Sequence, residues 1–329
     1  MRKMRKTRRN ARLVITVSIS ASISSVLSGA VLPTLASAAG KIDTPITGQG
    51  SSFVSNFLEQ CKADAKSASG INVTYQPTGS GAGRQGYIAG AVDFAASDVP
   101  FSAAELEKAK EKPFVYVPVV AGGIAMVYNL PGVSGLVLPG PVASKIFAGK
   151  IVMWNDAAIA KANPKLKLPK MVIKVIVRSD SSGTSAVFSN YLNAVDSATF
   201  PKGGLSNFPI PAVVGIGQKG SDGVGNYIAG SQGKGAIGYI EASFAAERKL
   251  PTASTINAAG KTVKPTAEAV TAALETAPIT PDGTIAIDHL TKTPAAYPIS
   301  TTSYIIAPTS ADANKKAAIG AFLAQIIGP

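Results

Sequence analysis

Short runs of β-branched and aromatic residues alternate along the chain with segments whose apolar residues recur at helical spacing. The first pattern is typical of buried strands and the second of amphipathic helices. The runs predict strands over residues 44–47, 71–76, 92–96, 114–119, 124–128, 172–177, 213–216, 235–241 and 303–307. The helical pattern covers residues 53–67, 80–88, 103–110, 143–147, 156–162, 186–192, 242–250, 267–275 and 311–327, and a further helix starts within 219–223.

This alternation predicts an α/β protein with largely parallel sheets. In such sheets, ligands bind at turns that follow the carboxyl ends of strands. Several of the predicted turns are rich in Gly and Ser and stand directly before a helix, so they are of the type that binds anions. Several such turns in one chain need a common cleft. We therefore expect two lobes that face each other across a ligand cleft, with the chain crossing near Val119 and returning near Tyr297.

The turn from Arg178 to Ser185 carries the strongest candidate chemistry. The first N–H groups of the following helix have no partner within the helix and lie at the positive end of its dipole, so the turn can hold an anion. Gly183 lets the backbone approach a ligand, Arg178 adds planar donors suited to a tetrahedral oxyanion, and Asp180 is near enough to orient Arg178. The same sequence also fits an ordinary N-cap without a ligand, and these residues alone leave both interpretations open.

The first 38 residues have the features of an export signal. Seven basic residues and no acidic residue precede Leu13, a largely apolar stretch follows, and residues 36–38 have the small side chains of a cleavage site. We expect removal after Ala38, although the apolar stretch is also long enough to be kept as a membrane anchor. The signal has no cysteine for lipid attachment, so the mature chain is expected to be soluble and periplasmic or extracellular.

Composition narrows the function classes further. An apolar fraction of 46% in 329 residues can fill the cores of two lobes. The formal net charge of +13 falls to +6 without the signal, and no run of Lys and Arg with interleaved aromatic residues indicates a nucleic-acid site. The only cysteine, Cys61, excludes an internal disulfide and is expected to be a buried core thiol.

Four ordered segments of the chain resemble the phosphate-binding proteins of bacterial phosphate ABC importers, the PstS family. These segments are Ser52-Phe53, Ser80 within Gly79-Ser80-Gly81-Ala82-Gly83, Asp98 at the end of residues 92–98, and Arg178 with residues 180–184. Further matches are residues 150–156, 163–164 with 168–169, 219–224, 235–241 and 297–299. The resemblance runs from about Thr47 to Ile306 and implies a two-lobed periplasmic-binding-protein fold of type II, with the ligand in a cleft between the lobes.

The resemblance also implies a set of phosphate-binding residues, namely Ser52, Phe53, Ser80, Asp98, Arg178, Ser182, Gly183 and Thr184. Ser52, where the family usually has Thr, would donate its hydroxyl, and the next residue its N–H. Ser80 would donate from side chain and backbone, and Arg178 from its guanidinium. Residues 182–184 would donate N–H groups, with hydroxyls from the first and last. Asp180 would be the partner of Arg178, and the family often has Gly where this chain has Ser181.

The acceptor in this set is Asp98, whose carboxylate would repel an anion unless a proton lies between them. Phosphate keeps a proton near neutral pH and sulfate does not. Asp98 can therefore accept a hydrogen bond from phosphate, whereas its lone pairs would face those of sulfate. Because a site built on an obligatory hydrogen bond rejects the analogue that lacks it by about 10⁴ or more, we expect phosphate to bind and sulfate to be refused.

The expected signal and the two expected crossings of the chain give the domain boundaries. Residues 1–38 are the signal peptide, residues 39–118 plus 298–329 form lobe 1, and residues 119–297 form lobe 2. The family normally continues with helical segments past the helix that ends here at Pro329. The C-terminal part of lobe 1 is therefore expected to be shorter than in the family.

The main hypothesis is an exported monomeric protein, not an enzyme, that binds mono- and dibasic inorganic phosphate with high affinity. It would deliver phosphate to the permease subunits of a phosphate ABC importer, with no cofactor, no metal and no nucleic acid. Two alternatives stay open: a secreted phosphate scavenger without an importer, and a secreted phosphatase with Ser182 or Thr184 as nucleophile. Against the phosphatase, the only histidine, His289, lies outside the motif segments, and no base stands beside either hydroxyl in the sequence.

Overall fold

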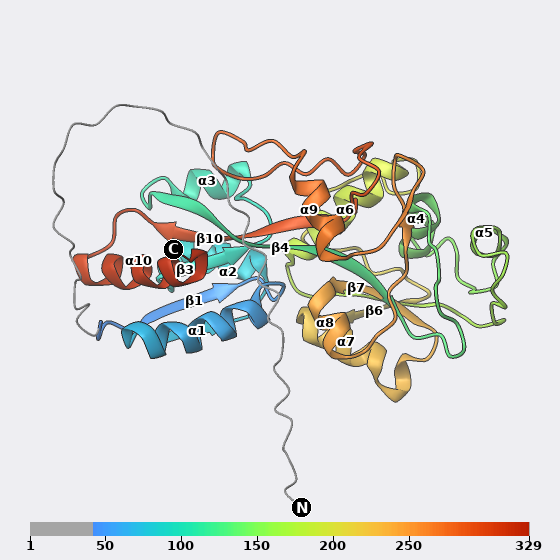
Figure 1. Cartoon of the computed structure of the whole chain (residues 1–329), viewed down its shortest axis with the longest axis horizontal. Helices are drawn as coiled ribbons and strands as arrows, with labels where there is room; N and C mark the ends of the chain where they lie inside the picture. Colours follow the sequence, from blue (N-terminus) through green and yellow to red (C-terminus); the bar gives the residue numbers. More distant parts are fainter. Residues whose placement is uncertain (1–41, 329) are drawn as a thin grey trace, which may run out of the picture. The chain divides into compact units, whose positions relative to one another are not determined.

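The computed structural model describes residues 42–328 (Figure 1). The export signal predicted over residues 1–38 therefore lies outside the described residues. Within residues 42–328, no helix combines the length and the apolar character needed to span a membrane.

An eight-stranded sheet runs through the described part of the chain, with its strands in the order β2-β1-β3-β10-β4-β7-β5-β6 (Figure 1). The strands are β1 (Ile46–Gly50), β2 (Val73–Gln76), β3 (Phe94–Ser97), β4 (Phe114–Tyr128), β5 (Lys174–Arg178), β6 (Gly215–Gln218), β7 (Ala236–Glu241) and β10 (Ser300–Pro308). A separate ribbon pairs β8 (Thr255–Ile256) with β9 (Thr262–Val263).

Helices connect most of these strands and cover the faces of the sheet. They are α1 (Ser55–Ser69), α2 (Ser80–Ala89), α3 (Ala103–Ala109), α4 (Gly140–Phe147), α5 (Ala157–Ala162), α6 (Gly183–Val195), α7 (Gly220–Ala229), α8 (Ala242–Glu247), α9 (Ala267–Leu274) and α10 (Ala313–Ile327), with a 3₁₀ turn η1 (Ser231–Gly233). The element order thus follows the predicted alternation, with shifts of a few residues at the ends.

The prediction of a largely parallel sheet was wrong, because the sheet is mixed. β1 is parallel to β2 and β3, and β5 is parallel to β6 and β7. In the middle, β10 runs antiparallel to both β3 and β4, and β4 runs antiparallel to β7. The alternation of strands and helices does not predict this, because the direction of β10 depends on pairing with strands far away in the sequence.

Strand β4 joins two halves of the sheet. It pairs with β10 from Phe114 to Gly123 and with β7 from Ile124 to Tyr128. We call strands β2, β1, β3 and β10 the β1 half, and strands β7, β5 and β6 the β5 half. The two short strands predicted at 114–119 and 124–128 are one strand, because β10 supplies partners across Gly122 and Gly123.

The core of the β5 half contains the only tryptophan of the chain. Trp154 is fully buried, and its indole Nε1 donates to the carbonyl oxygen of Gly235 at 2.9 Å. Nearby, Phe188 stacks on Tyr239 with ring centroids 4.6 Å apart. The stacking of Phe188 on Tyr239 holds α6, which follows β5, against β7 and so positions the turn between β5 and α6.

The core of the β1 half lies under α1 and α10. Phe322 of α10 is 1% exposed and packs on Phe94 of β3, with ring centroids 5.7 Å apart. Cys61 of α1 lies in the same cluster, and burial raises the pKa of its thiol to about 11. The prediction of a buried core thiol is therefore confirmed.

Truncation of Phe322 to alanine should destabilise the protein by about 3–5 kcal/mol, since it leaves a cavity beside Phe94. Urea unfolding followed by far-UV circular dichroism measures the change in the free energy of unfolding. The control is Ile327→Ala on the same helix, whose side chain belongs to a residue 57% exposed and should cost no more than about 0.5 kcal/mol. Equal effects of the two substitutions would contradict the packing of α10 in this core.

Candidate functional site

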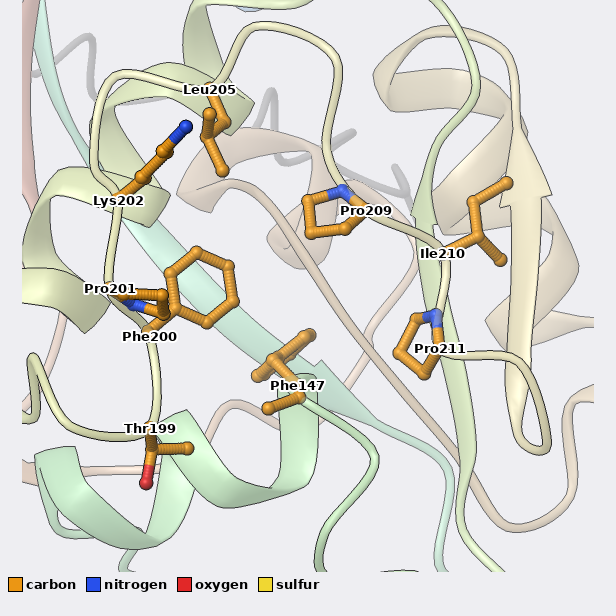
Figure 2. A pocket seen from close by; sticks show the side chains of 10 residues that line it. Phe147, Thr199, Phe200, Pro201, Lys202, Leu205, Pro209, Ile210 and Pro211 are labelled. Atoms are coloured by element: carbon orange, nitrogen blue, oxygen red, sulfur yellow. The ribbon is translucent and has the colours of Figure 1, made fainter.

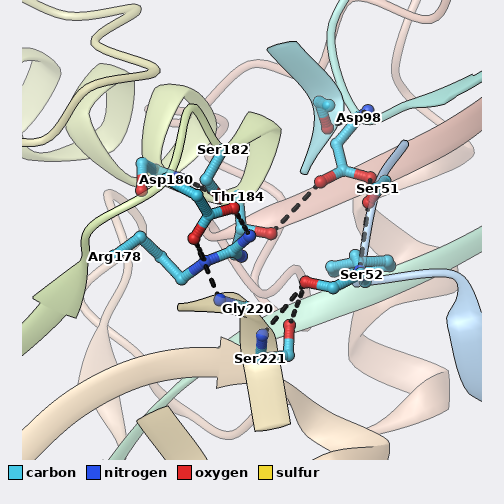
Figure 3. Close-up of polar contacts among 12 residues, drawn as sticks. Ser51, Ser52, Asp98, Arg178, Asp180, Ser182, Thr184, Gly220 and Ser221 are labelled. Atoms are coloured by element: carbon cyan, nitrogen blue, oxygen red, sulfur yellow. Dashed lines mark hydrogen bonds and ion pairs between the residues drawn. The ribbon is translucent and has the colours of Figure 1, made fainter. Parts of the chain in front are cut away.

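Turns from both halves of the sheet meet at one place. In the β1 half, the parallel strands β1 and β3 end at the same edge, where Ser51, Ser52 and Asp98 follow them. In the β5 half, the turns after β5 and β6 lead into α6 and α7. Figure 3 shows the polar side chains of these turns directed toward one another.

Asp98 is the centre of the contacts (Figure 3). It is 3% exposed, and its Oδ1 accepts hydrogen bonds from the hydroxyls of Ser51, at 2.5 Å, and Ser303. Its Oδ2 accepts a bond of 3.1 Å from the hydroxyl of Thr184 in the β5 half. Burial raises the pKa of Asp98, and these hydroxyls and the positive charge of Arg178 offset the increase only in part.

Arg178 lies at the carboxyl end of β5 with its side chain 2% exposed. Its Nε donates to Asp180 Oδ1 at 2.8 Å, and its Nη2 pairs with Oδ2. The N–H of Gly220 also donates to Asp180 Oδ1, at 2.9 Å. Burial would raise the pKa of Asp180, but the bonds and charge of Arg178 and the bond from Gly220 outweigh it, so the pKa lies below its usual value.

The ion pair leaves part of the guanidinium for other partners. Within residues 42–328, the hydrogen bonds of the Arg178 side chain involve Nε and Nη2, and Nη1 makes none. The backbone N–H of Arg178 donates to the hydroxyl of Tyr239 at 3.3 Å, and that hydroxyl also bonds to Ser185 Oγ at 2.7 Å. The aromatic core of the β5 half thus holds the residue that bears the positive charge of the site.

Helix α6 begins at this site with a capped N-terminus. Ser182 is the N-cap, and its hydroxyl accepts from the N–H of Ser185 at 3.2 Å. Its own N–H donates to Ser206 O at 2.9 Å. Gly183 cannot carry a side chain here, because a Cβ would lie 2.5 Å from Ser80 Oγ and 2.8 Å from Asp98 Cβ. The absence of a side chain lets the helix start pack directly against Asp98.

The turn after β1 meets the start of α7. The hydroxyl of Ser52 accepts from the N–H of Ser221 at 3.0 Å and lies 3.0 Å from the Ser221 hydroxyl. The N–H of Phe53 donates to Ser51 Oγ at 3.0 Å. Ser80, the first residue of α2, accepts from the N–H of Asp98 at 3.4 Å. These groups, expected to serve a ligand, bond to each other or to neighbouring residues in this structure.

The start of α2 also contacts the turn after β5. The N–H of Gly81 donates to the carbonyl oxygen of Ser181 at 2.9 Å. The preceding Gly79 has φ +99°, a conformation that side chains disfavour, and a Cβ there would overlap the Asp180 carboxylate. The two Gly/Ser turns therefore lie against each other. Ser181, at the position where the family often has Gly, provides the carbonyl oxygen that accepts from Gly81.

The structure adds residues that the sequence did not single out. Ser51 stands next to a predicted site residue, and Ser221 lies in the turn 219–223 recognised as a helix start. Ser303 lies inside a predicted strand and carried no sequence signal. It reaches Asp98 only because β10 pairs with β3.

An apolar hollow of ≈ 380 Å³ lies apart from these turns, between the end of α4 and the segment 199–211 (Figure 2). Its lining includes Phe147, Phe200, Pro209 and Pro211 and none of the predicted site residues. Among residues 42–328, no three His, Cys, Asp or Glu side chains are grouped to hold a metal ion.

The sequence profile of the PBP superfamily domain matches residues 35–328. A phosphate-binding protein PstS of Xylella fastidiosa strain Temecula1 is 39% identical over 283 residues, which cover 84% of this chain and 76% of that protein. PstS2 of Mycobacterium bovis BCG is 36% identical over 293 residues, or 85% and 78% of the two chains.

Solved structures of similar fold include a putative phosphate ABC transporter substrate-binding protein with bound phosphate from Clostridium perfringens. Its TM-score is 0.61 at 17% sequence identity, with 85% of this chain and 93% of that chain covered. These likenesses confirm the predicted two-lobed α/β fold of the type II periplasmic binding proteins.

Replacement of Asp98 by asparagine should change how stability depends on pH. The folded protein holds the Asp98 proton more tightly than the unfolded chain, whose Asp pKa is about 3.9. The resulting stabilisation is complete below that pH and is lost as pH rises through the folded pKa. The free energy of unfolding of Asp98→Asn minus that of the wild type should therefore increase with pH from about 4 upward and then level off.

Urea unfolding without oxyanions in the buffer, repeated at intervals between about pH 4 and pH 8, measures this difference. A difference that stays constant over the whole range would contradict a raised pKa of Asp98.

Proposed function

Because the chain belongs to the PBP superfamily and, within it, to the PstS family of phosphate-binding proteins, we propose that it binds inorganic phosphate and delivers it to a phosphate ABC importer. The observation that carries the proposal is that residues matching the phosphate-binding set of the family meet at one buried carboxylate, that of Asp98. Thr184 bonds to the Asp98 carboxylate, Ser80 accepts from its N–H, and the charge of Arg178 acts on it. A protonated tetrahedral oxyanion is the ligand that such a set fits best.

The donors of this site suit a desolvated anion. Each charge-assisted hydrogen bond that replaces water recovers roughly 1.5–3 kcal/mol. Arg178 supplies the positive charge through Nη1, and the hydroxyls of Ser52, Ser80, Ser182 and Thr184 are neutral donors, with N–H groups of Phe53, Gly183 and Thr184 beside them. Several of these groups bond to protein partners here, so binding exchanges those bonds for bonds to phosphate.

Asp98 gives the site its choice of ligand. Its Oδ2 is held by a single hydroxyl, that of Thr184, and lies next to the start of α6. Phosphate can donate its proton to this oxygen, whereas sulfate has no proton to donate. Sulfate would place the lone pairs of its oxygen against those of Oδ2 with no proton between them, and the cost of this unmade hydrogen bond excludes sulfate.

Binding would involve closure of two lobes, composed of residues 39–118 with 298–329 and of residues 119–297. In support, β4 changes its partner from β10 to β7 between Gly123 and Ile124. Contacts between the halves, such as Ser52 with Ser221, would form only on closure. Ligand contacts available only in the closed form would shift the population toward it.

The cellular role follows from these features together. The chain would act as an exported monomer, periplasmic or extracellular after signal cleavage, and its closed form would dock on the permease. Catalysis is not part of the proposal. Steady hydrolysis of an aryl phosphate by the purified protein would instead favour the secreted phosphatase, and phosphate uptake unaffected by loss of the protein would favour the scavenger.

Calorimetric titration of the exported chain, residues 39–329 freed of ligand by partial unfolding, should give tight binding of phosphate and no heat with sulfate. Asp98→Asn replaces the carboxylate by an amide, which can donate to a sulfate oxygen. Sulfate binding should therefore become measurable, and phosphate binding should weaken about tenfold. Displacement of phosphate from the wild type by equimolar sulfate would refute the proposed selectivity.

Replacement of Arg178 by lysine should weaken phosphate binding by about 10- to 100-fold. A lysine has no planar fork with which to serve both Asp180 and an oxyanion, so one of the two interactions is lost. The matched control is Arg248→Lys. The guanidinium of Arg248 pairs with the largely exposed Asp222, so this substitution should leave the dissociation constant for phosphate unchanged. Unchanged phosphate binding by Arg178→Lys would contradict the assignment of Arg178 to the phosphate site.

A further inference from the structure

Ser303 lies directly opposite Asp98 in the sheet. Strands β3 and β10 are antiparallel with Tyr304 paired to Ser97, so the next position along each strand places Ser303 against Asp98. Ser303 is fully buried, and its hydroxyl donates to Asp98 Oδ1. A second residue of β10, Thr301, donates to the backbone carbonyl of Asp98 at 3.4 Å. Strand β10 therefore holds both the side chain and the main chain of the acceptor.

The two carboxylate oxygens of Asp98 have unequal surroundings. Oδ1 accepts two O–H bonds, from Ser51 and Ser303, which both lie in the β1 half. Oδ2 accepts one bond, from Thr184 of the β5 half. An oxygen whose lone pairs already accept two O–H bonds is a poor place for a proton. A proton shared with Asp98 therefore belongs on Oδ2, the oxygen beside Thr184 and Gly183.

The pairing of β10 with β4 is irregular next to Ser303. The pairing of β10 with β4 passes from Ser303 opposite Val120 to Tyr304 opposite Pro118, so Val119 is an extra residue in β4. A bulge of this kind bends the strand that carries the extra residue, here β4, and bulges are frequent next to functional sites. This one lies in the strand pair that continues from one half of the sheet into the other.

From this geometry we infer that Ser303 is a positioning residue for ligand selectivity, which rests on the proposed phosphate function. Its hydroxyl, together with that of Ser51, keeps Oδ1 occupied by donors. Oδ2 is thereby fixed as the oxygen that accepts the ligand proton. Without the Ser303 hydroxyl, Asp98 would more readily hold its own proton and donate it to an oxyanion that has none.

Two other charged or titratable groups act on Asp98. Arg178 of β5 stabilises the ionised carboxylate, and Tyr75 of β2 has its pKa raised well above the usual value by burial and by the Asp98 charge. With this raised pKa, Tyr75 stays neutral between about pH 5 and pH 8. Sulfate also binds no proton in this range, so a pH dependence of sulfate binding would report the protonation of Asp98.

The test compares Ser303→Ala with Ser300→Ala, both buried serines of β10. The control removes a hydroxyl that, within residues 42–328, bonds only to the carbonyl oxygen of Tyr297, at 2.7 Å. For Ser303→Ala, the ratio of sulfate to phosphate dissociation constants should fall at least about tenfold, and most at about pH 5. Ser300→Ala should keep the wild-type ratio at every pH. Ser303→Thr, which restores the hydroxyl, should bring the ratio most of the way back to the wild-type value.

A second readout does not depend on a ligand. In ligand-free protein labelled with ¹³C, the carboxyl resonance of Asp98 should titrate at a higher pH in Ser303→Ala than in the wild type. If Ser303→Ala does not fold, Ser51→Ala, which removes the other donor to Oδ1 from the turn after β1, should produce the same two changes.

The outcomes separate the two proposals. An unchanged selectivity ratio and an unchanged Asp98 titration in folded Ser303→Ala would overturn the role of Ser303 and leave phosphate binding intact. Absence of phosphate binding by the folded wild type would overturn the proposed function, and the inference about Ser303 with it. Equal losses of selectivity in Ser303→Ala and Ser300→Ala would assign the effect to general loosening of β10 and also refute the inference.

Discussion

The rest of the site depends on one constraint, the burial of the Asp98 carboxylate among hydroxyl groups. A buried carboxylate is costly unless hydrogen bonds satisfy its oxygens. Here no cation bonds to it directly among the described residues, and Ser51, Ser303 and Thr184 provide the donors instead. These three hydroxyls come from three distant parts of the chain, so the fold must hold the turn after β1, strand β10 and the start of α6 at hydrogen-bonding distance from one point.

The sheet meets this requirement through its middle strands. Strands β4 and β10 pair along most of their length, and β4 continues into the β5 half. Asp98 is therefore held by the same pair of strands that joins the two halves of the sheet. Arg178, in contrast, is held within the β5 half by Asp180 and Tyr239. The negative and the positive group of the site thus belong to different halves, and their separation depends on how the halves meet.

Local features of this site could be predicted from the sequence, because neighbouring residues produce them. Ser182 as an N-cap and Gly183 at a close approach follow from the turn and the helix behind it. The resemblance to a known family added Ser52, Ser80 and Asp98, which the structure brings to one place. Contacts that depend on register could not be predicted. Ser303 and Ser221 lie more than a hundred residues from their partners, and the antiparallel insertion of β10 has no local signal.

The single tryptophan of this chain has a consequence for the fluorescence of the protein. Trp154 is fully buried, and its indole donates a hydrogen bond to a backbone carbonyl within the β5 half. Its emission should be that of an indole in an apolar environment and should report the unfolding of that half. The native indole therefore offers an optical probe of the folding of the β5 half that needs no added dye.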